Sequence, residues 1–242
     1  MVREVKEHAV RRRELLDAAQ RLVFTKGYEQ TAIQDLLDEL GIAKGTFYHY
    51  FKSKRDLLQA MVDRLTDDAL DLVNPIVDDP GLSAIEKLQQ LFDAIGGWKT
   101  ANRDYHLALL GVWYADDNAV ARWRVRVTRV ARMRPLIATI VQQGIEEGTM
   151  HAQAPAATAE VVLSMLQELV DALALHFLPD ASAGSDPSDV DAVMAAYTDA
   201  VERVIGVTPG SLSLVTPDVL AQWVDASATG HRARHQSNAA EV

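Results

Sequence analysis

Apolar residues in this sequence recur at the spacing of helix faces, and this periodicity decides the fold class. The first such stripe follows intervals of three and four residues along one side of a helix: Leu15, Ala18, Ala19, Leu22 and Val23. No segment alternates between polar and apolar residues with a period of two, and no hairpin dipeptide separates two β-branched runs. The sequence therefore predicts an all-α protein.

Capping residues mark the ends of the expected helices. A capping box, in which a serine or threonine is answered three residues later by an acidic or amide residue, is read at Thr31–Gln34, Ser53–Asp56, Ser83–Glu86 and Ser188–Asp191. Gly27 and Gly41 lie where a helix C-terminus favours a left-handed residue. We predict helices at about 5–26, 32–40, 44–50, 54–73, 83–100, 103–115, 118–147, 156–178, 188–205 and 217–224. Breaks are expected at 74–81, which holds two prolines, and at 179–187.

Two short amphipathic helices near the N-terminus are joined by a tight turn at Gly41. This arrangement is typical of a helix-turn-helix, whose second helix enters the major groove of DNA. In that second helix Phe47, Tyr50 and Phe51 share the core side by their spacing. The outward face then presents Lys44, Gly45, Tyr48 and His49.

Several side chains of this head are candidates for DNA contacts. Lys44 suits a guanine edge or a phosphate, Thr46 a base edge or a thymine methyl group, and Tyr48 and His49 phosphate oxygens. Further phosphate contacts are expected near two helix starts, from Thr31 as the cap of the second helix and from Lys52, Lys54 and Arg55. The alternative is that these residues only cap and solvate a three-helix bundle.

The charged residues are distributed unevenly, with a basic N-terminal part and an acidic remainder. The whole chain carries a net charge of −10, but residues 1–55 hold 11 lysines and arginines against 8 aspartates and glutamates, which gives +3. The other 187 residues hold 13 against 26, which gives −13. Because salt confines the field of a charge to roughly 10 Å, a phosphate responds to the local charge and not to the net charge.

The run from Thr31 to Leu58, with Gly-Ile-Ala-Lys-Gly-Thr-Phe-Tyr-His-Tyr-Phe at its centre, resembles the DNA-binding head of the TetR/AcrR family of bacterial regulators. With the preceding helix the resemblance spans roughly residues 10–60. It implies a homodimer, a nearly palindromic operator, and repression relieved by a small molecule bound in the C-terminal domain. It also implies phosphate contacts for Thr31, Tyr48, His49 and Lys54, and base contacts for Lys44, Gly45 and Thr46. Ala43 departs from the family pattern, which often has Ser or Thr there.

The remainder of the chain supplies candidates for an effector pocket. Polar-tipped aromatic and basic residues on neighbouring helices could line it, and we single out Trp98, Tyr105, His106, Trp113, Trp123, Arg134 and His176. The aromatic residues could equally be core, and the histidines could be structural. Arg134 is expected to point inward, because it lies on a stripe with Val130 and Ile137, and would then need an internal carboxylate or an anionic ligand.

Two late helices, near 156–178 and 188–205, are rich in small and branched apolar residues. Two such helices from each protomer can form a four-helix dimer interface. The expected organisation is a DNA-binding domain at 1–55, an effector-binding and dimerisation domain at 56–226, and a disordered tail at 227–242. We expect the segment after Gly206 to pack back onto the body.

Other classes of site find little support. The chain has no cysteine, which excludes disulfides and thiolate chemistry. Neither a catalytic constellation nor a metal-ligand spacing emerges, and no cofactor is expected; the acidic row Asp63, Asp67 and Asp71 is read as a solvated face. With no apolar signal or membrane span, a cytoplasmic location is expected. The sequence predicts a dimeric transcriptional repressor with a small-molecule effector; the alternatives are a DNA-bound adaptor for a protein partner and an enzyme with an incidental head.

Overall fold

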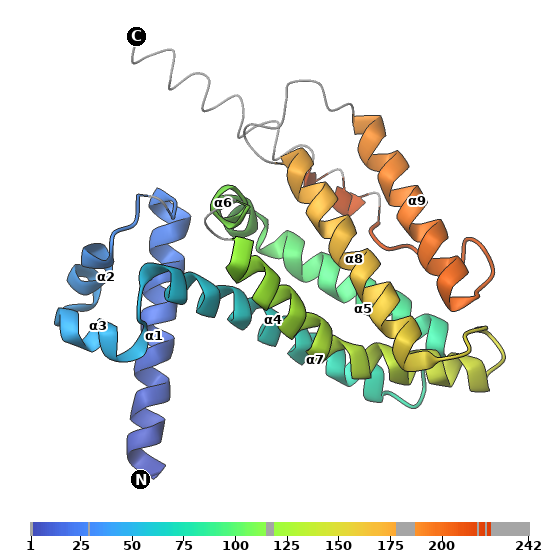
Figure 1. Cartoon of the computed structure of the whole chain (residues 1–242), viewed down its shortest axis with the longest axis horizontal. Helices are drawn as coiled ribbons and strands as arrows, with labels where there is room; N and C mark the ends of the chain where they lie inside the picture. Colours follow the sequence, from blue (N-terminus) through green and yellow to red (C-terminus); the bar gives the residue numbers. More distant parts are fainter. Residues whose placement is uncertain are drawn as a thin grey trace. The chain divides into compact units, whose positions relative to one another are not determined.

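The computed structural model describes residues 2–28, 30–114, 119–177, 187–216, 218–220 and 222–223, and these contain helices and no strand. The helices are drawn in chain order in Figure 1: α1 (Val2–Lys26), α2 (Ile33–Leu40), α3 (Lys44–Tyr50), α4 (Lys54–Asp78), α5 (Ala84–Ala101), α6 (Arg103–Trp113), α7 (Ala119–Glu146), α8 (Pro155–Phe177) and α9 (Pro187–Ile205). The predicted all-α class is confirmed. Most ends lie within a few residues of the expected ones.

One predicted helix end is wrong. Helix α4 was expected to stop before Asn74, but it continues through Pro75 to Asp78. A proline inside a helix removes one backbone hydrogen bond and costs about 3 kcal/mol. Val73 and Val77, on either side of Pro75, are buried in one core cluster, and their burial offsets that cost.

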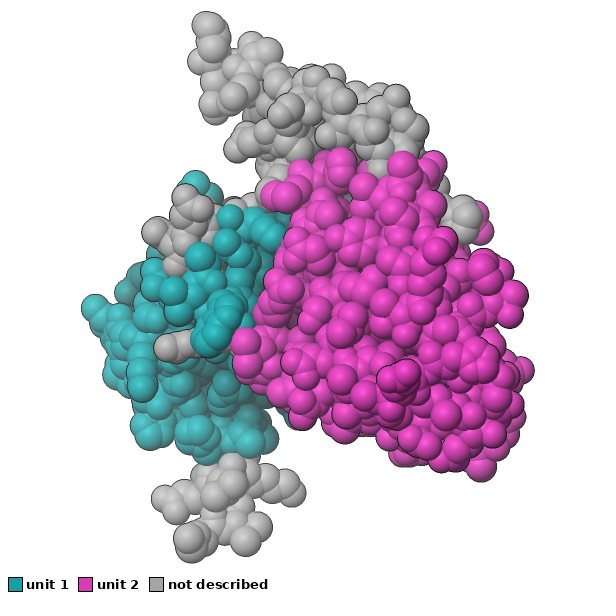
Figure 2. Space-filling model, turned by 45° about the vertical axis from the view of Figure 1, so that its right-hand side comes forward, with its two compact units in different colours: residues 1–67, 104–125 teal, residues 68–103, 126–242 magenta. Residues whose placement is uncertain are grey.

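The chain divides into two compact units, coloured separately in Figure 2. Unit 1 comprises residues 1–67 and 104–125, and unit 2 comprises residues 68–103 and 126–242. The predicted head at 1–55 falls within unit 1, which also takes in the start of α4, most of α6 and the start of α7. The predicted tail at 227–242 lies outside the described residues.

Each unit has its own apolar core. In unit 1 the α1 stripe packs with residues of α2, α3, α4 and α6, and its most deeply buried side chains include Leu15, Phe47, Phe51 and Leu58. In unit 2 the core joins α4, α5, α7, α8 and α9 around Ile137, Ile140 and Val141, which are at most 1% exposed. Helices α8 and α9 lie side by side (Figure 1).

The segment after α9 packs back onto unit 2, as predicted, and a buried carboxylate organises it. Glu202, 4% exposed, accepts hydrogen bonds from the backbone N–H groups of Gly210 at 2.9 Å and Leu212 at 2.8 Å. The Gln89 amide on α5 pairs with the backbone of Ser213, accepting at 2.8 Å and donating at 3.2 Å. Such side-chain pairing satisfies a segment that has no regular secondary structure.

Candidate nucleic-acid interface

Helices α2 and α3 are joined by a tight turn. Gly41 ends α2 in the left-handed conformation, with φ 61° and ψ 38°, and the N–H of Ile42 donates to Leu37 O at 3.0 Å. This is the pattern of a glycine C-cap, as the sequence predicted. Helix α3 begins only three residues later, at Lys44, and its cap residue Ala43 makes no side-chain hydrogen bond.

The two faces of α3 differ in exposure in the way that the sequence predicted. Phe47 and Phe51 are at most 1% exposed and belong to the core of unit 1. On the opposite face Tyr48 is 45% exposed. Lys44, Gly45 and His49 are exposed with it, while Thr46 is half-buried. Four of the predicted contact residues of α3, namely Lys44, Gly45, Tyr48 and His49, therefore share one accessible surface.

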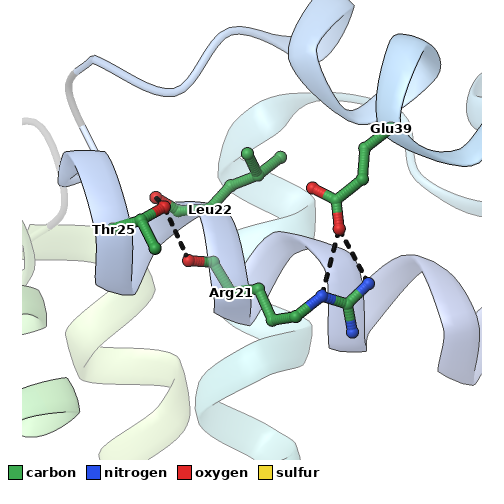
Figure 3. Close-up of polar contacts among 4 residues, drawn as sticks. All are labelled: Arg21, Leu22, Thr25 and Glu39. Atoms are coloured by element: carbon green, nitrogen blue, oxygen red, sulfur yellow. Dashed lines mark hydrogen bonds and ion pairs between the residues drawn. The ribbon is translucent and has the colours of Figure 1, made fainter.

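An ion pair fixes α2 against α1. Both Nε and Nη2 of Arg21 donate to Oε1 of Glu39, at 3.0 and 2.8 Å, and Figure 3 shows the guanidinium reaching across to the carboxylate. Thr25, also drawn in Figure 3, donates its hydroxyl to Arg21 O at 3.0 Å within α1. An exposed pair of this kind contributes at most about 1 kcal/mol, so its main effect is on orientation.

Two further lysines follow α3 in the chain, Lys52 just before α4 and Lys54 at its first residue. Ser53 caps α4 by accepting from the N–H of Asp56 at 3.1 Å, and the Asp56 carboxylate accepts from the N–H of Lys52 at 2.8 Å. The serine half of the predicted capping box is therefore present, whereas the carboxylate bonds the N–H of Lys52 and not that of the cap residue Ser53. The ammonium group of Lys54 lies 4.2 Å from the centre of the Tyr28 ring, a cation–π contact that holds it at the surface, and Lys52 is exposed.

The predicted role of Thr31 as the cap of α2 is wrong. Thr31 is only 3% exposed, and its hydroxyl donates to Gly27 O at 2.7 Å. The cap residue is Ala32, whose N–H donates to the Asp35 carboxylate at 2.7 Å. The turn after α1 brings the Gly27 carbonyl within reach of Thr31, and sequence spacing alone does not reveal that partner.

The predicted effector residues do not share one unit. Trp98, Arg134 and His176 belong to unit 2, whereas Tyr105, His106, Trp113 and Trp123 belong to unit 1. Trp98, His106, Trp113 and His176 are half-buried, and the side chain of Tyr105 lies outside the described part. Trp123, which by its spacing shares the stripe of Val130 and Arg134 and was therefore expected to face inward, is instead 64% exposed.

Arg134 does not point inward. Its side chain is 51% exposed, and Nη1 lies 3.2 Å from Oε2 of Glu160, which is also exposed. The buried stripe of α7 is centred on Met133, Ile137 and Ile140, so Arg134 falls at its edge. Ile137 is buried as predicted, but Arg134 is not, so Arg134 requires neither an internal carboxylate nor an anionic ligand.

A different basic pair lies within unit 2. Desolvation, with a smaller contribution from the nearby Arg129 guanidinium, lowers the pKa of Lys99 to about 8. Arg129 also donates to Oε1 of Gln167 at 3.2 Å. Sequence reasoning missed Lys99, and the only available signal was a lysine among the aromatic and apolar residues at the end of α5.

Three further findings concern a cavity, metal binding and membrane spans. A cavity of about 430 Å³ in unit 2 is lined by Ile85, Gly148, Thr149, His151, Gly206, Val207 and Thr208, none of which was predicted as an effector residue. Among the described residues there is no cluster of acidic or histidine side chains suited to a metal ion. None of the described helices has the length and apolarity needed to cross a membrane.

Comparison with known proteins gives family matches in two parts of the chain. Residues 15–61 match the model of bacterial regulatory proteins of the tetR family, and residues 113–177 match that of the tetracyclin repressor-like C-terminal domain. The HTH-type transcriptional repressor KstR2 of Mycobacterium tuberculosis is 28% identical over 141 residues, which cover 57% of this chain and 68% of the relative.

Solved structures show the same fold. A regulator of the TetR/AcrR family from Thermobifida fusca is 26% identical with a TM-score of 0.51, over 64% of this chain and 81% of that chain. A TetR transcription regulator from Haloarcula marismortui has a TM-score of 0.58 at 19% identity, over 82% of this chain and 97% of that chain. The resemblance noted in the sequence is confirmed. With its head and its C-terminal domain both matching models of one family, this chain belongs to the TetR family of bacterial regulatory proteins.

Proposed function

We propose that this DNA-binding regulator is a homodimeric repressor that binds a nearly palindromic operator and leaves it when a small-molecule effector binds the body. The observation that carries the proposal is the exposed face of α3, on which Lys44, Gly45, Tyr48 and His49 lie together beside the lysines of α4. The relative named as a repressor favours repression over activation. Neither a catalytic nor a metal role is part of this proposal.

We assign the residues on this face of α3 to two kinds of DNA contact, one with base edges and one with phosphates. Gly45 has open space where a Cβ would lie, which lets the backbone of α3 approach a base pair closely. Lys44 then reaches a base edge or a phosphate, and Thr46 lies one residue beyond Gly45 on the same helix. Tyr48, His49, Lys52 and Lys54 are assigned to phosphates, which set the position of the helix in the groove.

We assign dimerisation to α8 and α9. Helix α8 exposes Val161 at 48% and Leu175 at 57%, whereas its neighbouring residues Val162, Leu163 and Leu169 are buried in the core of unit 2. Pairing α8 and α9 with their copies would bury such residues in a four-helix bundle. Two heads held about 34 Å apart can then read half-sites one helical turn apart.

Effector control would act through helix α4, in which the chain passes from unit 1 to unit 2. An effector lowers operator affinity only by the difference in its affinity for the DNA-bound and released states. If the released state has another spacing of the two heads, both cannot occupy their half-sites at once.

The test is a fluorescence-anisotropy titration of the full chain against its own upstream DNA and against genomic fragments selected by binding. Tyr48→Ala should weaken operator binding strongly, and Tyr48→Phe, which removes only the hydroxyl, should weaken it less. A small-molecule screen for release of bound DNA then tests effector control. A chain that binds no fragment would refute the regulator proposal, and one that binds but is released only by a protein would instead favour an adaptor for a protein partner.

A further inference from the structure

Helix α1 begins well before the region that the family model describes. It runs from Val2 to Lys26, whereas the match to the family begins at Leu15. The segment from His8 to Glu14 continues the same helix and carries three successive arginines, Arg11, Arg12 and Arg13, against one glutamate. This basic extension, residues 8–14, is not explained by the packing of the head.

The basic extension lies against the end of α3. The ring of His8 lies 4.5 Å from that of Tyr50 and 5.5 Å from that of His49, measured between centroids. The guanidinium of Arg12 lies 5.2 Å from the centre of the Phe51 ring. His8 and Arg12 are one helical turn apart, so one face of α1 makes both contacts. The extension is thus held beside the residues of α3 that we assign to phosphates.

The arginines of this extension are available to an external anion. Arg11, Arg12 and Arg13 are all exposed. Among the residues that the structure describes, none forms an ion pair with Arg13. Arg11 pairs with Glu14 at 2.7 Å, but both side chains are nearly half exposed, and such a pair is readily exchanged for a phosphate. Arginine binds phosphate through two parallel N–H donors, which suits a nucleic-acid backbone.

We propose that residues 8–13 form a second phosphate-binding surface, continuous with the end of α3, that holds the sugar-phosphate backbone of duplex DNA beside the groove occupied by α3. This inference rests on the proposed operator binding. The contacts are to phosphates and not to bases, because the extension adjoins His49 and Tyr50 at the end of α3 and not the start of α3, where Lys44 and Gly45 lie. It therefore adds affinity without adding sequence preference.

The salt dependence of operator binding measures the number of phosphate contacts made by the basic extension. Each phosphate contact contributes about 0.9 to the slope of log K against log salt concentration for duplex DNA. Arg13→Ala removes one contact per protomer, so a dimer should lose about 1.8 of slope. Arg12→Ala combined with Arg13→Ala should lose about twice as much, and Arg13→Lys should restore most of the loss because it keeps the charge.

The experiment titrates full-length wild-type and variant protein against the selected operator between about 50 and 200 mM salt. Arg132→Ala, which removes an exposed arginine from unit 2, is the matched control for net charge and should leave the slope unchanged. The ratio of operator to non-operator affinity should stay constant in the Arg13 variants. Hydroxyl-radical footprints should lose protection of the backbone next to each half-site.

Two results would overturn the inference while leaving the proposed function standing. One is an operator affinity and salt slope of Arg13→Ala equal to those of Arg132→Ala, which would leave the extension to another partner such as an acidic protein segment. The other is a changed base preference, which would mean that the extension reads bases. If wild-type protein binds no DNA fragment, the proposed function fails and the inference fails with it.

Discussion

Replacing Glu202 with glutamine should release the segment that follows α9. The carboxylate is 4% exposed and accepts two backbone N–H groups, from Gly210 and Leu212. A hydrogen bond to a charged group contributes roughly 1.5–3 kcal/mol to stability. Glutamine keeps one acceptor oxygen but turns an NH2 group toward the other N–H donor, so one bond is lost and two donors face each other.

The expected loss of unfolding free energy for Glu202→Gln is therefore about 2 kcal/mol, which for a domain of this size lowers the melting temperature by about 4–8 °C. Urea denaturation measures the change in unfolding free energy, and amide hydrogen exchange at Gly210 and Leu212 shows whether the segment after α9 is released locally. Glu168→Gln, at an exposed position on α8, is the matched control and should change stability by less than about 0.5 kcal/mol. Unchanged protection of both amides would refute the assignment of Glu202 as the organising group.

Three further predictions concern single positions. Gly206→Ala should destabilise the fold by several kcal/mol in urea denaturation, because φ is 72° and a Cβ would lie 2.7 Å from His151 O; a stability equal to wild type would contradict this geometry. Because the folded state lowers the pKa of Lys99 from 10.5 to about 8, Lys99 is neutral in the folded chain and protonated in the unfolded chain between these two pH values. Unfolding then takes up a proton, so the unfolding free energy should increase between pH 8 and 10.5. Lys99→Met should remove that increase, and a pH profile identical to wild type would count against it. Thr31→Val should cost about 1 kcal/mol of stability because it loses the hydrogen bond to Gly27 O, and it should leave the operator affinity of the folded protein unchanged. A loss of operator affinity without a loss of stability would show that Thr31 contacts DNA.

Local features of the sequence predicted the head well. Periodicity placed Phe47 and Phe51 in the core and Tyr48 at the surface, because side chains of one short helix can be sorted by angle alone. The turn at Gly41 was also predictable, since a left-handed cap is a local requirement of the backbone. These features need no knowledge of distant residues.

Features that depend on a partner far along the chain were not predictable. Pro75 stays within α4 because its neighbours are buried in a core assembled from four other helices. Arg134 was expected to face inward, but a wide apolar stripe leaves residues at its edge undecided until the packed neighbours are known. Glu202 showed no pattern at all, because its partners are backbone N–H groups of an irregular segment.

The all-α class, the helix-turn-helix and the outward face of α3 could be predicted from spacing within single helices and from glycine at a turn. The burial of Thr31, the surface pair of Arg134 with Glu160, and the packing of residues 8–14 against the end of α3 became visible once the helices were packed. The physical reason is that burial and pairing depend on which surfaces meet, and a one-dimensional pattern gives the faces of a helix without naming the partners that will cover them.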